Sequence, residues 1–279
     1  MITYATVEEA ERALGRAMTW VEAAWFRHSG STPDYCLYFE SLVILIAAYS
    51  LTALPLALFE LCMPALAVQA SAQVAILDGD SHNVRYNEQI AGIRTGLPLP
   101  SAEEVALQLL VYMLMEDYLG YWLHRLLHCE WAYDNIHYVH HEYPAPMGFA
   151  AGHSHWAELL ILGFPAFFVT IIVPCHMATL WLWYAIRAAM AVETHSGFDF
   201  PFSPTKLIPF YGGVERHDYH HSGGRMMQSN FAPLFVICDY IYGTDDYRHH
   251  RASLVKLKDM ANISAKKEVF DGSNCRKKD

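Results

Sequence analysis

The chain has 279 residues, enough for one large domain or two small ones. Hydrophobic residues make up 53% of it and charged residues 17%, a shift from the usual soluble composition toward lipid. The formal net charge of −10 argues against a basic face, so we expect no nucleic-acid partner. Histidine stands out with 16 residues, most of them in short clusters between His124 and His221.

Residues 1–35 predict an N-terminal amphipathic segment without a cleavable signal peptide, because the first residues are polar and acidic. Thr6 and Glu9 fit a capping box that opens a helix reaching about Arg27. Insertion into a membrane would then begin at the first internal apolar segment.

Residues 36–100 contain that segment and a polar loop behind it. The stretch 41–59 carries no charge and approaches the roughly 20 apolar residues that a spanning helix needs. The loop ends in a run of Gly, Leu and Pro, which breaks regular structure. Ser101 and Glu104 then cap a second apolar helix, which we expect to end near Leu123.

A second long uncharged run covers 159–186 and is broken at Pro174, which predicts a hairpin of two short spans. If the N-terminus is cytosolic, the histidine clusters and the basic tail 248–279 fall on the cytosolic side. Only Arg85 and Arg94 then lie in the lumenal loop, in agreement with the positive-inside rule. The four predicted spans are 41–59, 105–123, 159–173 and 177–192.

Three clusters, HRLLH, HYVHH and HDYHH, place histidines three and four residues apart, the spacing of neighbours on one helix face. Imidazole is a ligand for iron, zinc, copper and nickel. Eight imidazoles are too many for one ion, so two metals are implied, and the spacing leaves iron or zinc open. The predicted ligands are His124, His128, His137, His140, His141, His217, His220 and His221.

Further candidates flank the predicted hairpin. His195 lies at its return to the cytosolic side and is a candidate ninth ligand. His155 lies before it and is either a ligand or a residue that orients one. Carboxylates that could accept the second N–H of an imidazole, the alternative being plain interfacial charges, are Asp117, Glu158, Glu193 and Asp218.

These three boxes resemble those of the fatty-acid-hydroxylase/sterol-desaturase superfamily. The branch that holds plant sterol 4α-methyl oxidases and the related very-long-chain aldehyde decarbonylases is similar over nearly the whole chain. The residues that carry this closer similarity are Glu116-Asp117-Tyr118, His155-Trp156-Ala157-Glu158, Glu193 to Pro201, Pro209 to Gly213 and Tyr242 to Asp245.

The resemblance implies an all-α fold of polytopic membrane helices, with a cytosolic helical cap that holds a histidine-rich di-metal site. Residues 101–247 would form the catalytic domain. It further implies an endoplasmic-reticulum enzyme with two non-haem iron ions that uses O2 and electrons from NAD(P)H, delivered by cytochrome b5 or a similar carrier. Such an enzyme requires a lipid substrate and an electron-transfer protein, and it could form homo- or hetero-oligomers.

Two lipid substrates follow from the branch. A sterol 4α-methyl group is expected ahead of a long-chain aldehyde converted to an alkane in wax synthesis, because the chain lacks the large C-terminal domain usual in the aldehyde enzymes. The stretch 70–95 is shorter than in relatives, which raises the question of a reduced or inactive variant. The alternatives from other classes are a zinc-dependent hydrolase of membrane lipids and a non-catalytic subunit of an active paralogue.

Overall fold

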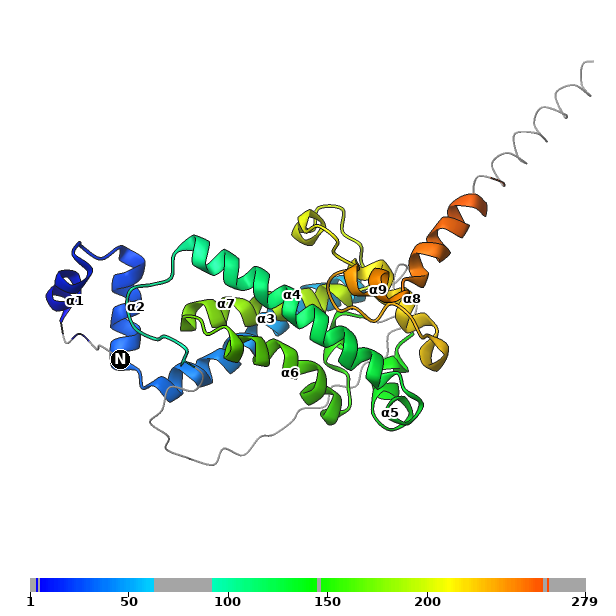
Figure 1. Cartoon of the computed structure of the whole chain (residues 1–279), viewed down its shortest axis with the longest axis horizontal. Helices are drawn as coiled ribbons and strands as arrows, with labels where there is room; N and C mark the ends of the chain where they lie inside the picture. The colour runs from blue at the N-terminus through cyan, green and yellow to red at the C-terminus, as the bar shows by residue number, and fades with distance from the viewer. Residues whose placement is uncertain (1–3, 5, 63–91, 145–146, 258–259, 261–279) are drawn as a thin grey trace, which may run out of the picture.

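In the computed structural model, residues 4, 6–62, 92–144, 147–257 and 260 are described. Four long helices run lengthwise along the molecule, with α1 and α2 at one end and the short helices α5, α8 and α9 at the other (Figure 1). Over the described ranges the regular structure is helical, and the extended pairing consists of two isolated bridges, Arg94–His176 and Tyr211–Phe235. The long helices are α3 (Asp34–Cys62), α4 (Ala102–Leu127), α6 (Trp156–Ile172) and α7 (Met177–Thr194).

The N-terminal segment forms two helices, α1 (Val7–Leu14) and α2 (Trp20–Ser31). The predicted start is confirmed, because the Thr6 side chain accepts a hydrogen bond from the backbone N–H of Glu9. The prediction of one helix to Arg27 is wrong. Gly15 ends α1 in the left-handed region at φ 68°, a conformation that glycine adopts without steric strain, and a full capping box at Thr19 opens α2.

The predicted cap of α4 is confirmed, since Ser101 accepts from the backbone N–H of Glu104. The helix runs one turn beyond Leu123, to Leu127, and so carries His124 within its last turn. The hairpin is confirmed as α6 and α7, separated by the turn at Pro174. The helix α3 packs along α7 and α4 packs along α6, so the bundle consists of two pairs that face each other.

Helices cover all four predicted spans. By length and composition, Asp34–Leu58 of α3 is the one helix of the described ranges that is suited to cross a membrane, and α6 is a shorter apolar helix. Large apolar side chains are exposed along α3, α4 and α6, among them Ile46, Leu107, Leu160 and Phe167. The polar stretch between α3 and α4 lies largely outside the described residues, as does the end of the basic tail.

The opposite end from α1 is a cap of short elements. The second histidine box folds as a 3₁₀-helix rather than as the expected α-helix, while the third lies on α8. A further helix covers 246–257. The named elements of the cap are α5 (Glu130–Asn135), η2 (His137–Glu142), η3 (Gly148–Gly152), η4 (Pro204–Leu207), α8 (Gly213–Ser222), η5 (Gly224–Met226) and α9 (Ile237–Tyr242).

Candidate metal centre

Nine histidines converge in two groups, and within each group the ligand nitrogens lie within 4.8 Å of one another. The eight box histidines are all present, and His195 joins them. All are buried except His217, which is partly exposed. The five-histidine group is His124, His128, His137, His141 and His220; the four-histidine group is His140, His195, His217 and His221.

The five-histidine group is assembled from three elements. His124 lies in the last turn of α4 and His128 is its C-cap, so their spacing of four places both on one face. His137 and His141 come from η2. The Nε2 atom of His137 lies 3.2 Å from that of His124 and 3.1 Å from those of His128 and His141. His220 of α8 completes the group, and its Nε2 has no hydrogen-bond partner within the described part of the chain.

The four-histidine group joins η2, α7 and α8. His195, the C-cap of α7, is its centre: its Nε2 lies 3.1 Å from that of His140 and 2.8 Å from that of His217. The Nε2 of His221 lies 3.0 Å from that of His217, four residues earlier on α8. The spacings within α8 therefore split its three histidines between the two groups, with His220 in one and its neighbours in the other.

Backbone carbonyls fix which ring nitrogen faces each centre. The Nδ1 of His124 lies 2.7 Å from the Phe231 oxygen, and that of His195 lies 2.8 Å from the Ala191 oxygen. The Nδ1 atoms of His140 and His220 likewise face the carbonyls of His153 and Ser229. A carbonyl only accepts, so each of these Nδ1 atoms carries the proton and each Nε2 presents a lone pair.

Lone pairs that face one another at about 3 Å are not hydrogen bonds and repel unless a cation lies between them. Two ligands about 2.1 Å from an ion and a right angle apart would hold their nitrogens about 3 Å from each other. The observed Nε2 separations of 2.8 to 3.2 Å match that arrangement. The nine imidazoles therefore fit two cations, one in each group.

The electrostatics keep the imidazoles neutral, the form that binds metal. Burial is the largest cause throughout and lowers the pKa of His124 and His195 to about 4 and that of His141 to about 3. Burial and the neighbouring imidazoles hold the pKa of His137 and His217 well below the usual value.

The loop that supplies two of these carbonyls is held by two buried carboxylates. Asp117 of α4 accepts from the backbone N–H groups of Leu234 and Phe235, each at 2.9 Å. Asp239 of α9 accepts from the N–H of Phe231. A Cβ on Gly120 would lie 2.9 Å from the Pro233 ring, so only glycine allows the loop to approach α4 this closely.

The four candidate carboxylates make different contacts in the structure. Glu158 lies 3.0 Å from the Nδ1 of His137 and is the one that contacts a histidine of the two groups. Asp117 holds the loop instead, and Glu193 accepts from Ser203 and Thr205 near η4.

Asp218 and His155 also lie outside the two groups. The Oδ1 of Asp218 is buried and has no hydrogen-bond partner in the described ranges, and burial raises the pKa of Asp218 to about 7. His155 is the N-cap of α6, where its Nδ1 accepts from the N–H of Ala157. The lone pair of its neutral imidazole, on Nδ1, therefore accepts this hydrogen bond and is not free to bind a metal.

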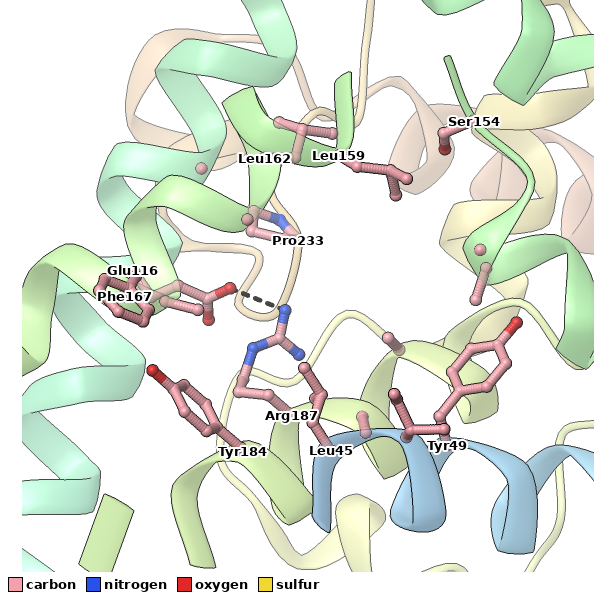
Figure 2. Close-up of a pocket in the computed structure, with 18 of the residues that line it drawn as sticks. Leu45, Tyr49, Glu116, Ser154, Leu159, Leu162, Phe167, Tyr184, Arg187 and Pro233 are labelled. Carbon is pink, nitrogen blue, oxygen red and sulfur yellow. Dashed lines mark hydrogen bonds and ion pairs between the residues drawn. The ribbon is translucent and has the colours of Figure 1, made fainter. Parts of the chain in front are cut away.

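A cavity of about 880 Å³ leads to the histidines between the two helix pairs. Apolar side chains of α3, α4, α6 and α7 form most of its wall, with Leu45 and Tyr49 opposite Leu159 and Leu162 (Figure 2). Its size is within the usual range of small-molecule sites. The histidines on its lining are His124, His140, His195 and His217.

Comparison with known proteins identifies the relatives. The family model for fatty acid hydroxylase matches residues 109–244. A very-long-chain aldehyde decarbonylase of Oryza sativa subsp. japonica is 49% identical over an alignment that covers all of both chains. Methylsterol monooxygenases 1-1 and 1-2 of Arabidopsis thaliana are 48% and 46% identical, each over 95% of this chain and 97% of the relative. No solved structure matches.

These relatives confirm the resemblance but correct one argument drawn from it. A relative named as an aldehyde decarbonylase aligns over its whole length with this chain, so length does not distinguish the two substrates. Sequence reasoning also missed the residues that orient the imidazoles through backbone atoms, Phe231 and Ser229. The available signal was indirect: Asp117 is a buried charge in an apolar helix, and such a charge needs a partner.

Proposed function

The chain belongs to the fatty acid hydroxylase family of oxidoreductases, and on that premise we propose that it is a membrane-bound di-iron oxygenase that oxidises the 4α-methyl group of sterol precursors. The observation that carries the proposal is the convergence of nine neutral imidazoles into two groups at the end of a lipid-sized cavity. All nine are proposed ligands, and His155 is not, because its Nδ1 caps α6.

Iron is favoured over zinc by the donor set. Structural and catalytic zinc sites are usually tetrahedral, with three or four protein ligands and often cysteine. Five imidazoles in one group exceed that number, and Nε2 separations near 3 Å suit ligands at right angles better than tetrahedral ones. This count argues against the zinc hydrolase. When bound, the two irons would supply activation of O2 with electrons that originate from NAD(P)H and arrive through cytochrome b5 or a similar carrier.

The protein's own residues bind and orient the metals and exclude water. The carbonyls of Phe231, Ser229 and His153 accept from imidazole N–H groups and hold the rings in place. Glu158 Oε1 lies 3.0 Å from the Nδ1 of His137, and its carboxylate would offset part of the cationic charge. The apolar wall of the cavity keeps the reacting carbon away from bulk water.

Membrane embedding is supported by the exposed apolar side chains of α3, α4 and α6. We place the predicted spans 41–59, 105–123, 159–173 and 177–192 in the bilayer of the endoplasmic reticulum, with both histidine groups and both termini in the cytosol. Lys and Arg residues are concentrated on that side of the assigned topology, as the positive-inside rule requires. A lipid would enter from the bilayer into the cavity between the α3–α7 and α4–α6 pairs.

The second candidate is conversion of a very-long-chain aldehyde to an alkane. It is favoured by the relative of that name, which aligns over the whole chain at 49% identity. The sterol is preferred because three of the relatives that align over most of the chain, at 46–48% identity, are methylsterol monooxygenases.

The test is expression in a yeast strain that lacks its own sterol 4-methyl oxidase, with a parallel culture fed long-chain aldehydes. Rescue with loss of 4,4-dimethylsterols is expected, and it should disappear in His220→Ala. Alkane formation without rescue would establish the aldehyde reaction instead. Full activity of His220→Ala in complex with a paralogue would show that the chain is a non-catalytic subunit. Metal analysis of the purified protein should give about two irons per chain, and zinc alone would refute the di-iron site.

A further inference from the structure

Two charged side chains meet inside the wall of the cavity. Arg187 of α7 donates from Nη2 to Glu116 Oε1 of α4 at 2.7 Å, and both residues line the cavity. The Glu116 side chain is only 3% exposed and that of Arg187 17%. A buried ion pair adds little stability compared with apolar residues, and charges at membrane depth are usually retained for function.

The pair leaves hydrogen-bonding capacity unused. Glu116 Oε2 and Arg187 Nε are buried and have no hydrogen-bond partner among the residues that the structure describes. The same is true of the hydroxyl of Tyr184, one turn before Arg187 on α7. Figure 2 shows the three side chains on one side of the cavity, with Tyr49 across from them. An acceptor and two donors are therefore available to a molecule in the cavity.

The position of the pair relates it to the histidines. Glu116 and Arg187 each precede a proposed ligand, His124 or His195, by eight residues, which separates the α-carbons by about 12 Å along the helix. Glu116 and Arg187 line the same cavity as His124 and His195. The pair thus borders the part of the cavity that the histidines line.

We propose that Glu116, Arg187 and Tyr184 bind the hydroxyl group of the lipid substrate. The substrate O–H donates to Glu116 Oε2, and its oxygen accepts from Arg187 Nε or the Tyr184 hydroxyl. An aldehyde oxygen only accepts, and it would leave the buried Glu116 oxygen unpaired. This assignment rests on the proposed lipid oxidation and narrows its substrate to an alcohol, such as a 3-hydroxysterol.

The test compares two probes, 4,4-dimethylcholestan-3β-ol and the same hydrocarbon without its hydroxyl. Dissociation constants are measured on the metal-loaded protein in lipid nanodiscs without a reductant, so that no turnover occurs. The wild type should bind the alcohol roughly 10- to 100-fold more tightly, the usual range for a hydrogen bond to a charged group. The variant Glu116→Leu/Arg187→Met removes both charges together and avoids a lone buried charge. It should lose most of that preference and bind the hydrocarbon unchanged.

A preference that persists in the double variant would overturn the assignment, as would an equal loss of both probes, which indicates a purely structural ion pair. Tyr184→Phe should reduce the preference by a smaller factor. Tyr49→Phe is the matched control, because its hydroxyl already donates to the Phe149 carbonyl, and it should leave the ratio of the two constants unchanged. If the wild type binds neither probe but converts long-chain aldehydes, the sterol function fails and the hydroxyl site fails with it.

Discussion

The two histidine groups differ in how they meet the cavity. Three members of the four-histidine group line it, His140, His195 and His217, whereas His124 alone represents the five-histidine group. The group with fewer donors is therefore the more accessible one. Five imidazoles nearly complete the coordination of one ion, while four leave room for another ligand, the general distinction between closed and open metal sites. An ion held by the four-histidine group would be the one nearer to a lipid in the cavity.

We call the four-histidine group the open group and the five-histidine group the closed group. The largest effect is expected from removing a ligand of the open group. His195→Ala should lower product formation by more than about 100-fold, since loss of an outer partner alone costs about 10- to 100-fold. Metal content should fall from about two ions to about one per chain, because the five-histidine group remains complete. Metal analysis and product quantification on the same preparation measure both.

His155→Asn is the matched control for that variant. Both histidines flank the α6–α7 hairpin, but His155 caps α6, and asparagine is an equally good cap. Metal content and activity should stay at wild-type values. A loss of metal in His155→Asn, or two retained ions in His195→Ala, would contradict the assignment of the open group.

The carboxylate of Glu158 contacts the closed group, and its charge is expected to strengthen metal binding there. Glu158→Gln keeps the size of the side chain that contacts His137 but removes the charge. Metal affinity of the five-histidine group should fall about 10- to 100-fold, as is usual when a carboxylate behind a ligating histidine is lost. The control is Glu142→Gln. Glu142 is an exposed carboxylate on η2, the helix that carries His137, and it pairs with His153, so its neutralisation should have no such effect. Equal loss in both variants would indicate a general effect of charge.

A smaller effect, shared by both groups, concerns pH. Burial lowers the pKa of His124 and His195 to about 4 in the metal-free fold, against about 6.5 in the unfolded chain. The unfolded chain therefore binds more protons between these values, and the stabilisation present above pH 6.5 is lost as pH falls toward 4. The melting temperature of metal-free protein should be several degrees lower at pH 5.5 than at pH 7.5. An unchanged value would show that the imidazoles are accessible to water without metal.

Sequence reasoning proposed the eight box histidines, which the structure brings together, because residues three and four apart share a face of an α-helix. The second box departs from this rule, since it lies on a 3₁₀-helix and its His137 and His140 fall in different groups. Sequence reasoning could not divide His220 from His221, because that depends on how α8 meets α4 and η2. The caps at Thr6 and Ser101 were equally local and are confirmed. The break at Gly15 was missed because apolar periodicity was followed through it.

The partners of the carboxylates depended on long-range packing. Asp117 accepts hydrogen bonds from the N–H groups of Leu234 and Phe235, which lie more than 100 residues later in the chain. The sequence around Asp117 does not predict these partners. The pairing of Arg187 with Glu116 is of the same kind. A charged residue in an apolar helix can be recognised from the sequence, and it predicts that a partner exists. Which residue is that partner depends on the fold.

The smallest expected effect concerns the link between the groups. Ser154 Oγ lies 3.3 Å from the Nδ1 of His140, in the four-histidine group, and 3.5 Å from Oε1 of Glu158, which contacts His137 of the five-histidine group. Both contacts are long, and His140 already donates to the His153 carbonyl, so each contributes little. Ser154→Ala should weaken metal retention by about threefold to fivefold, within the roughly 1 kcal/mol of one hydrogen bond.

The two ions should be affected alike in that variant, because the hydroxyl touches one partner of each group. Titrating the metal out with a chelator, and resolving the two release steps, measures the change for each group separately. Ser222→Ala removes an exposed hydroxyl that donates to the Tyr219 carbonyl on α8 and should leave both steps unchanged. If Ser154→Ala alters one step alone, the two groups bind their ions independently, and the difference between the open and the closed group can be assigned to each group's own residues. If it alters both, loss of one ion should also loosen the other, and His195→Ala would then retain its remaining ion less tightly than wild type does.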